Sequence, residues 1–307
     1  MARESRCIKV SRKEGEKTRR KLAEDGLLDN SLKPFSDESY LYIPVTGEVP
    51  GAMSEIFEER ETSDPLPRHE LIGGIAIMQD CDRDEARRLL DSRPVIHTVL
   101  HSEGPVTGEY RTKDYVVLAG KETTKTDYTE YGQRFMIDLS AAYFSARLAN
   151  ERQRIGAMMK DGERLLDMFA GVGPFAITLS GKCSVVYAND INPSAVSLLA
   201  DNIRLNKKKN IIPILADARH LGEIFPPENF DRIVMNLPMK SPEFLDVAFR
   251  LCKPGGMIHF YTLQSEPGEM KEELKKYECK KILEKIVRSY SPSQHHAVYD
   301  IEVISGD

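Results

Sequence analysis

Leu165–Ile177 (LLDMFAGVGPFAI) decides the fold that we predict for this chain. Its first two residues indicate a short buried strand, and Asp167 follows them. Gly171 and Gly173 predict a sharp turn, because glycine has no Cβ to block positive φ or close approach to a ligand. Pro174 suits the first position of a helix, whose free N–H groups would then face the turn. The stretch favours a cofactor pocket, but an ordinary strand-to-helix turn would show the same pattern.

Polar residues end the three strands predicted after this turn. Asp190 follows Ser184–Tyr187, Asp217 follows Ile211–Leu215, and Asn236-Leu237-Pro238 follows Asp231–Met235. Asp190 lies about twenty residues beyond the glycines, where a carboxylate can bind both ribose hydroxyls of an adenosine. Asp217 is a candidate acidic group beside adenine, and Asp167 could hold a cationic amino group. The combination resembles the class I S-adenosylmethionine (SAM) methyltransferases and predicts SAM as the cofactor.

The composition indicates an ordinary soluble protein of 307 residues, with 41% hydrophobic and 30% charged residues. No stretch approaches 18 apolar residues, so we expect no membrane span. The net charge of −5 argues against a protein that coats nucleic acid indiscriminately, although a local basic patch could still bind RNA. Five scattered cysteines without a C-x-x-C pair favour reduced thiols in the cytoplasm. His97 and His101 have no visible third ligand, so no metal site is predicted.

The predicted fold class is α/β, with a mostly parallel Rossmann-like sheet whose last strand is antiparallel. The domain boundaries that we predict are an N-terminal module at 1–61, a linker at 62–68, a second α/β module at 69–139 and the SAM-dependent domain at 140–307. The linker contains two prolines among small polar residues. A closing antiparallel pair is expected at Lys281–Tyr290 and Ala297–Ile304.

Several individual elements follow from local patterns. In the N-terminal module, strands are predicted at Cys7–Val10 and Tyr40–Val45. Ser11–Ala23 is predicted as a basic helix that either contacts nucleic acid or is a solvated face. Ile72–Met78 is predicted as one strand of the second module, and Ser140–Met158 as one helix that leads to the cofactor strand.

Over nearly its whole length, the chain resembles the archaeal and eukaryotic type of tRNA (guanine-37-N1)-methyltransferase. The markers stand in one order: CIKV at Cys7, YLYIPV at Tyr40, GEYRT around Arg111, YFSARLANER from Tyr143, DMFAGVGPF at Asp167, NDINP at Asn189, MNLP at Met235 and VRSYSP at Val287. The family's helix motif usually reads YFSPRL, and Ala146 stands here in place of the proline. This departure bears on the local backbone and removes no functional side chain.

The resemblance implies methyl transfer from SAM to N1 of guanine-37 in the tRNA anticodon loop. It implies an N-terminal module that contacts the outer corner of tRNA, and we expect a monomer that binds neither DNA nor a membrane. The catalytic residues that it assigns are Glu151, Arg111, Asn236 and Tyr143. The cofactor-binding residues that it assigns are Asp167, Phe169, Gly171, Gly173, Asp190, Ile191, Asp217, Ala218, Asn236 and Pro238.

The chemistry of guanine fits these assignments. N1 carries a proton at neutral pH, so methylation needs a base near N1, a cation for the charge that develops on O6, and a methyl donor in line. By resemblance, Glu151 would take the proton and Arg111 would stabilise O6. Asn236 would position the guanine through its amide, and Tyr143 would pack near it or shape the pocket.

Three alternatives stay open at this point. A related enzyme transfers the aminocarboxypropyl arm of SAM to a modified guanine at the same tRNA position, but it generally lacks the module that Cys7–Val45 represents. Some relatives also methylate the wyosine precursor. A SAM-binding RNA protein without catalysis is the non-enzyme alternative, against which the presence of Glu151, Arg111 and Asn236 argues. For Tyr143–Arg152 itself, a structural salt-bridged helix is the alternative to a catalytic role.

Overall fold

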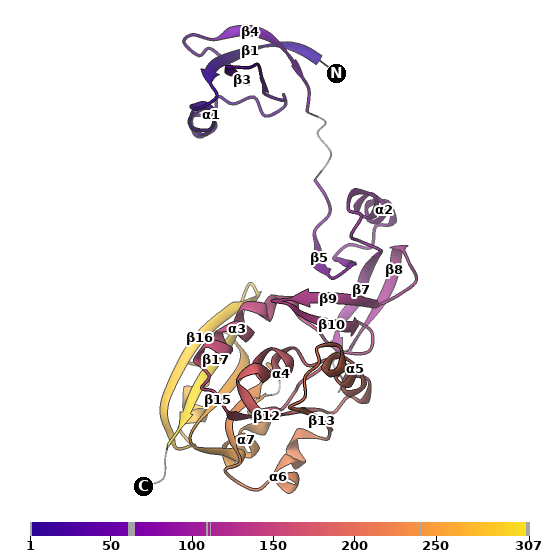
Figure 1. Ribbon diagram of the computed structural model, residues 1–307, viewed down its shortest axis with the longest axis vertical. Coiled ribbons are helices and arrows are strands. Elements are labelled where there is room, and N and C mark those ends of the chain that lie inside the picture. Colours follow the sequence, from indigo (N-terminus) through magenta and orange to yellow (C-terminus); the bar gives the residue numbers. More distant parts are fainter. Residues whose placement is uncertain (1, 61–64, 109, 111, 240, 305–307) are drawn as a thin grey trace. The chain divides into compact units, whose positions relative to one another are not determined.

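The computed structural model describes residues 2–60, 65–108, 110, 112–239 and 241–304 (Figure 1). The chain divides into two compact units, Met1–Pro65 and Leu66–Asp307. This boundary falls inside the predicted linker at 62–68, of which residues 62–64 lie outside the described residues. Among the described residues, no helix is long and apolar enough to cross a membrane.

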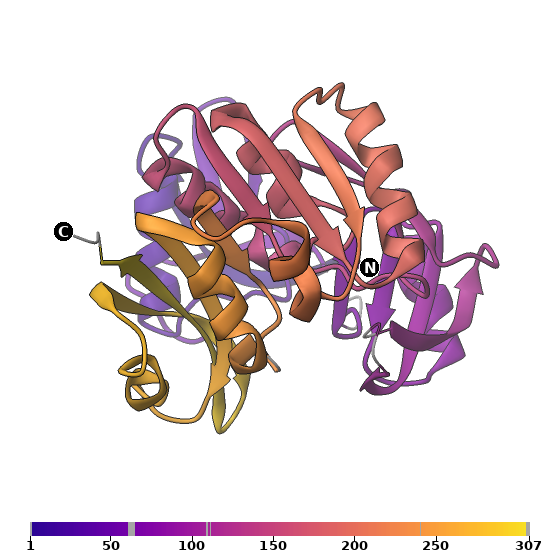
Figure 2. The same ribbon diagram turned by 90° about the horizontal axis from the view of Figure 1, so that it is seen from below.

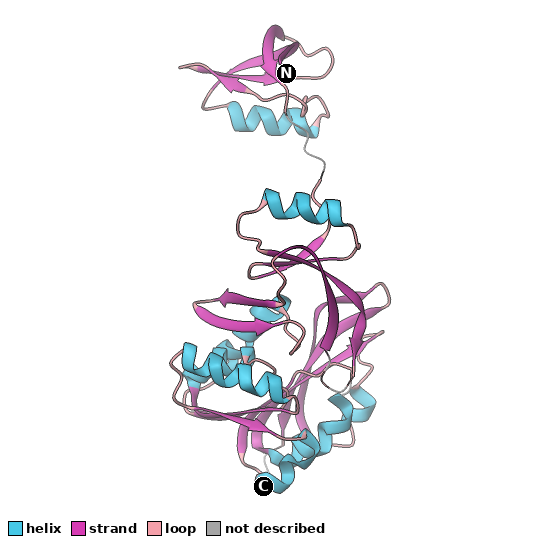
Figure 3. Cartoon of the chain, turned by 90° about the vertical axis from the view of Figure 1, so that its right-hand side faces the viewer, coloured by secondary structure: helices cyan, strands magenta, loops and turns pink. Residues whose placement is uncertain are grey.

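The N-terminal unit is an antiparallel sheet of order β2-β3-β1-β4 with one helix. Its elements are β1 (Ala2–Ser11), α1 (Gly15–Glu24), β2 (Phe35–Ser36), β3 (Tyr40–Pro44) and β4 (Met53–Glu58). Leu22 of α1 packs with Ile43 and Val45 in one buried cluster. The helix of this unit lies beside its strands (Figure 3). The predicted strands and basic helix are confirmed, but the helix begins at Gly15, because Ser11 still pairs with Tyr40 in the sheet.

The second unit begins with a four-stranded sheet of order β5-β6-β7-β8. Its elements are β5 (His69–Ile72), β6 (Ile75–Met78), α2 (Arg83–Ser92), β7 (Thr98–Thr107) and β8 (Thr112–Gly120). The prediction of one strand at Ile72–Met78 is wrong, because the chain reverses at Gly73 and β5 pairs antiparallel with β6. Gly73 has φ +57°, and a Cβ there would lie 2.1 Å from the carbonyl oxygen of Asp127, so only glycine fits this turn.

A separate hairpin, β9 (Lys125–Glu130) with β10 (Gln133–Asp138), lies against helix α5 (Pro193–Leu205). The Asn202 side chain accepts from the Met136 amide at 2.7 Å and donates to the Met136 carbonyl at 3.1 Å. Asn206, which follows the helix, makes the same pair of bonds with Arg134 at 2.9 and 2.6 Å. Two asparagines one helical turn apart therefore form hydrogen bonds with backbone N–H and C=O groups of β10, which would otherwise be unpaired at the edge of the hairpin.

The core of the second unit is a seven-stranded sheet of order β13-β12-β11-β14-β15-β17-β16 (Figures 1 and 2). Strands β11 to β15 run parallel, and β17 runs antiparallel to both of its neighbours, as the sequence predicts. Besides α5, the elements are β11 (Glu163–Asp167), α4 (Pro174–Leu179), β12 (Cys183–Asp190), β13 (Ile211–Leu215), α6 (Leu221–Ile224), β14 (Phe230–Met235), α7 (Leu245–Leu251), β15 (Cys252–Gln264), α8 (Lys271–Leu274), β16 (Cys279–Ser291) and β17 (Gln294–Val303).

The two faces of this sheet carry separate hydrophobic clusters. Leu165 packs with residues of α4 and α5, whereas Leu166, the next residue of β11, packs with residues of α6 and α7. Successive side chains of a strand point to opposite faces, so a strand covered by helices on both sides is apolar at every position. The cluster on the α4 face also contains Phe135 of β10 and Leu100 of β7. The predicted division at residue 139 stays a prediction, because both parts belong to one compact unit.

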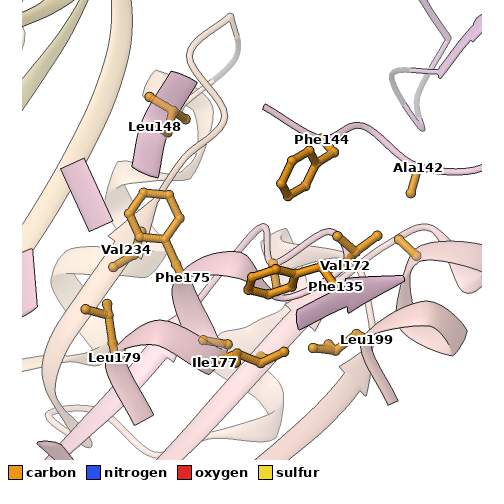
Figure 4. Packing of buried hydrophobic residues seen from close by; sticks show 14 of the residues in the cluster. Phe135, Ala142, Phe144, Leu148, Val172, Phe175, Ile177, Leu179, Leu199 and Val234 are labelled. Carbon is orange, nitrogen blue, oxygen red and sulfur yellow. The ribbon is translucent and has the colours of Figure 1, made fainter. Parts of the chain in front are cut away.

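The prediction of one helix over Ser140–Met158 is wrong. Helix α3 covers Ala149–Met158, a short 3-10 helix (η1, Ala146–Leu148) precedes it, and Ser145 is extended with φ −134°. Ala142, Phe144 and Leu148 are buried in the same hydrophobic cluster (Figure 4). Tertiary burial therefore holds 140–145 in an irregular conformation that local propensity does not predict. Ala146 is the first residue of η1, a position that also suits the family's proline.

Candidate functional site

The glycine turn forms as the sequence predicts. Gly171 has φ +56°, and Gly173, which has φ +93°, is the N-cap of α4. A Cβ on Gly173 would lie 2.4 Å from a methyl carbon of Leu199, so helix α5 packs directly against the turn. A Cβ on Gly171 would lie 3.5 Å from the carbonyl oxygen of Tyr143, which places the irregular segment 140–145 beside the same turn.

A cavity of about 440 Å³ lies at the carboxyl ends of β11, β12 and β14. This is the volume of a small-molecule site, at the sheet edge where parallel α/β sheets bind their ligands. The residues with predicted roles that line it are Tyr143, Phe169, Gly171, Asp190, Ile191, Asp217, Ala218 and Asn236. The structure therefore brings residues from four separate motifs to one cavity.

Four of the described residues with predicted roles do not line this cavity. Asp167 and Gly173 lie behind its wall, and Pro238 lines a smaller cavity next to it. Glu151 lines neither cavity, although Leu148, three residues earlier in the chain, lines both. Arg111 lies outside the described residues.

Asp190 fixes the glycine turn as well as facing the cavity. Its Oδ2 accepts a hydrogen bond from the Gly171 amide at 2.7 Å, and its Oδ1 accepts one from the Asn192 amide at 2.9 Å. Burial raises the pKa of this carboxyl, and the backbone donors oppose that rise. Each carboxylate oxygen keeps a lone pair for a further donor such as a ribose hydroxyl.

Asp167 is a completely buried carboxyl whose two oxygens make no well-aligned hydrogen bond with the described residues. Burial raises its pKa to about 7, and the charge of Asp190 adds to the rise. The backbone N–H groups of Phe169 and Ala176 oppose this rise only in part, so the buried carboxylate stays costly, and a bound cation would lower both the cost and the pKa. Asp167 therefore favours a positive charge close by, and because it does not line the cavity, an ammonium group would have to reach it through the cavity wall.

Asp217 stands at the cavity with a partner of its own. Arg219 donates to its Oδ2 at 2.6 Å, and this interaction holds the pKa of Asp217 below its usual value. Asp217 also accepts from the Arg219 amide at 2.9 Å and so begins the short helix that follows β13. Its carboxylate is ionised at neutral pH and can still accept from a ligand.

Glu151 is 4% exposed and belongs to a buried polar network. Arg154 donates to its Oε1 at 2.8 and 2.5 Å, and the Tyr261 hydroxyl donates to the same oxygen at 3.0 Å. Lys285 lies 3.5 Å from its Oε2. Burial alone would raise the pKa of Glu151, but Arg154, Tyr261 and Lys285 together hold it below the usual 4.5. The carboxylate is therefore ionised throughout the neutral range.

The network continues through the sheet. Arg154 donates to Asp300 at 2.6 Å, and Asp300 accepts from His259 Nδ1, also at 2.6 Å. Because Arg232 donates to His259 Nε2 at 2.6 Å, His259 is the neutral Nδ1–H tautomer, and its burial lowers its pKa accordingly. Asp300 is held ionised, its pKa lowered to about 2 by these partners against the effect of burial.

A second buried ion pair closes the cavity from the α3 side. Arg152 lines the cavity, is 1% exposed and donates from Nε to Glu130 of β9 at 2.7 Å. Its second guanidinium nitrogen bonds the other oxygen of Glu130. A bidentate arginine–carboxylate pair fixes both side chains in orientation. The alternative interpretation of Tyr143–Arg152, a structural helix held by salt bridges, therefore fits the side chain of Arg152. Glu151 is ion-paired as well.

The sequence reasoning missed Glu130, Arg154, His259 and Asp300. No local motif marks these residues. His259 and Asp300 face each other in the register of β15 with β17, so only the pairing of strands reveals their contact. Glu130 ends a polar strand, so its sequence context predicts a solvated side chain. Only the packing of the β9–β10 hairpin against α3 shows that it is buried.

Comparison with known proteins gives two family matches. The sequence matches the TRM5/TYW2 methyltransferase domain over residues 126–287 and the tRNA methyltransferase 5 N-terminal domain over residues 7–53. Trm5b of Pyrococcus abyssi, a tRNA (guanine(37)-N(1))-methyltransferase, is 36% identical over 97% of this chain and 98% of its own. Its crystal structure superposes with a TM-score of 0.76, at 35% identity over 98% of this chain and 99% of that chain.

Two further relatives bear on the substrate. A structure of aTrm5 in complex with tRNALeu has a TM-score of 0.72 and 31% identity, covering 97% of this chain and 99% of that one. The tRNA(Phe) (4-demethylwyosine(37)-C(7)) aminocarboxypropyltransferase of Methanocaldococcus jannaschii is 35% identical, but it aligns with only 76% of this chain and 96% of its own. The N-terminal match at residues 7–53 is therefore the feature that separates the two kinds of relative.

Proposed function

This chain belongs to the TRM5/TYW2 methyltransferase family, and from that premise we propose how its residues methylate guanine-37 of tRNA at N1. It is a SAM-dependent tRNA (guanine-37-N1)-methyltransferase. The observation that carries this function is the full-length likeness to Trm5b together with the N-terminal domain at residues 7–53. Nucleoside analysis of a G37 transcript after incubation with SAM tests it. Cytoplasmic location and a monomeric state stay predictions.

SAM supplies an electrophilic methyl group, and the chain supplies its binding site. Asp190 would accept from the ribose hydroxyls, and Asp217 would stand beside the adenine. Asp167 is the buried carboxylate without an aligned donor, so it would hold the ammonium of the methionine part. The turn at Gly171 lets the backbone approach the ligand without a Cβ in the way.

Asn236 is the residue best placed to orient the guanine. It lines both cavities, and its side-chain oxygen is buried without a hydrogen-bond partner among the described residues. Guanine presents N–H donors at N1 and N2 and an acceptor at O6. An amide side chain matches this edge because it accepts through its oxygen and donates through its nitrogen. Tyr143, which also lines both cavities, would pack against the ring.

Glu151 would remove the N1 proton, and Arg111 would stabilise the developing charge on O6. Glu151 is ionised at neutral pH, as a base must be, and it lies one helical turn beyond Leu148 of the cavity wall. Arg154 and Tyr261 hold its carboxylate in place. Because Glu151 does not itself line a cavity in this structure, the proposal requires guanine to reach past Leu148, or Glu151 to turn toward it.

We expect the N-terminal unit to contribute only to tRNA binding. Deleting residues 1–60 should weaken binding of full-length tRNA, because the exposed cations of α1 are lost, and should leave SAM affinity unchanged. An isolated anticodon stem-loop should bind the truncated and full-length proteins alike. Filter binding with both RNAs and calorimetry with SAM measure these affinities. A truncated protein that no longer binds SAM would show that the domain boundary is misplaced.

A further inference from the structure

A second cavity, of about 20 Å³, adjoins the cofactor cavity. Tyr143, Leu148 and Asn236 line both cavities, so the smaller one lies directly beside the residues proposed to hold guanine. Its remaining wall comes from Pro238 and from the last three strands of the sheet, which contribute Arg288, Tyr290 and His296 among others. The volume admits about one water-sized group and excludes a nucleobase.

The strand register aims these side chains at the site. Arg288 of β16 lies opposite His296 of β17, and on its other side His296 lies opposite Leu263 of β15. The Leu263 amide donates to the Pro238 carbonyl at 3.0 Å, which joins this wall to the turn that carries Asn236. The β16–β17 pairing shifts register on both sides of Arg288, and such irregularities re-aim side chains next to functional sites.

Among the described residues, Arg288 has no anionic partner. Its Nε is buried without an acceptor, and no carboxylate of the described residues forms an ion pair with its guanidinium. Four other described arginines near the site are paired with carboxylates: Arg152 with Glu130, Arg154 with Glu151 and Asp300, Arg219 with Asp217, and Arg232 with Glu163. A buried donor of a charged group that lacks an acceptor is unfavourable unless a ligand supplies one.

Among tRNA groups, a phosphate oxygen fits this position best. It is small enough for the cavity, it is anionic, and arginine binds phosphate through its planar fork of donors. Tyr290 lies next to the cavity and is 51% exposed, so its ring is open to a neighbouring nucleotide. We infer that Arg288 binds a backbone phosphate of the anticodon loop beside the target guanine and thereby anchors the strand while the base enters the site. This inference rests on the proposed function.

The test compares Arg288→Gln and Arg288→Lys with the wild type, using the full-length protein, SAM and a G37 tRNA transcript. The matched control is Lys281→Gln, which removes an exposed charge near the other end of the same strand. Arg288→Gln should lower kcat/KM for tRNA by about 10- to 100-fold, as expected for one lost bond to a charged group, with SAM affinity unchanged. Arg288→Lys should recover most of the loss.

Salt dependence separates a phosphate contact from a structural role. The slope of log kcat/KM against log salt concentration should become shallower by about 0.7 in Arg288→Gln, the value for one contact on a single strand. It should stay at the wild-type value in Arg288→Lys and Lys281→Gln. An unchanged slope in Arg288→Gln, at any rate of methylation, would overturn the inference and leave Arg288 a packing residue. A wild-type protein that forms no 1-methylguanosine would instead refute the proposed function.

Discussion

Glu151→Gln should slow single-turnover methylation of G37 by about 10²–10⁴-fold, the usual contribution of a general base. Glutamine keeps the shape and one acceptor oxygen, so the hydrogen bond from Tyr261 survives while the basic carboxylate is lost. SAM and tRNA affinities should stay near wild type. Rapid-quench measurement with enzyme in excess over tRNA gives the rate of the chemical step. The matched control is Glu302→Gln, which removes a carboxylate near the end of β17 that is ion-paired with Lys280 and makes no contact with Glu151 among the described residues.

The pH profile sharpens this test. The pKa of Glu151 is held below 4.5, so the carboxylate loses its charge only below that pH, and the wild-type rate should show no acidic limb from Glu151 above it. Removing the Arg154 guanidinium in Arg154→Gln takes away the strongest force that lowers this pKa. The acidic limb should then move upward into the measurable range. A Glu151→Gln protein that methylates at the wild-type rate, with chemistry limiting, would make Glu151 a structural ion-pair residue.

Asp190→Ala should weaken SAM binding by about 10- to 100-fold, which corresponds to the roughly 1.5–3 kcal/mol of hydrogen bonds to a charged group. The structure adds a second effect, because Asp190 also accepts from the Gly171 amide. Asp190→Asn is therefore the matched variant, since its remaining oxygen can still hold the turn. Calorimetry with SAM, together with thermal unfolding of each variant, measures both effects.

A cofactor analogue distinguishes ribose recognition from support of the turn. The wild type should prefer S-adenosylhomocysteine over its 2′-deoxy analogue. Asp190→Asn should lose part of that preference, because the 2′-hydroxyl then no longer donates a hydrogen bond to a charged carboxylate. Equal preference in the two proteins would assign Asp190 a structural role only. Unchanged SAM affinity in a folded Asp190→Ala protein would refute its role in cofactor binding.

The parts of the fold that the sequence predicts are those that local chemistry determines. Gly171 and Gly173 occupy positive φ, and Pro174 begins a helix, so their residue types alone define the turn. The strands around Leu165 are buried on both faces of a parallel sheet, so their sequences are short continuous apolar runs that predict buried strands. Segment 140–145 contains no helix-breaking residue, and the burial of Ala142 and Phe144 overrides its propensity.

The site is predictable where a single strand end supplies a residue, as for Asp190 and Asn236. It is not predictable where function depends on pairing between distant segments. His259 meets Asp300 only through the register of β15 and β17, and Arg288 comes to lie opposite His296 only through the pairing of β16 with β17. One sequence carries no signal for such registers. Glu151 pairs with Arg154 within α3, whereas its ion pair with Lys285 of β16 depends on the packing of α3 against the sheet.

Methylation of N1 of guanine-37 can be tested by one labelling assay that follows both groups SAM can transfer. The protein is incubated with SAM labelled separately in its methyl group or its aminocarboxypropyl arm and with transcripts bearing G37 or A37, and the nucleosides are then separated. We predict methyl-labelled 1-methylguanosine from the G37 transcript and no labelled product from the A37 transcript. Transfer of the aminocarboxypropyl label, equal methylation of both transcripts, or no product from G37 by the folded, SAM-binding protein would refute methylation of guanine-37 at N1.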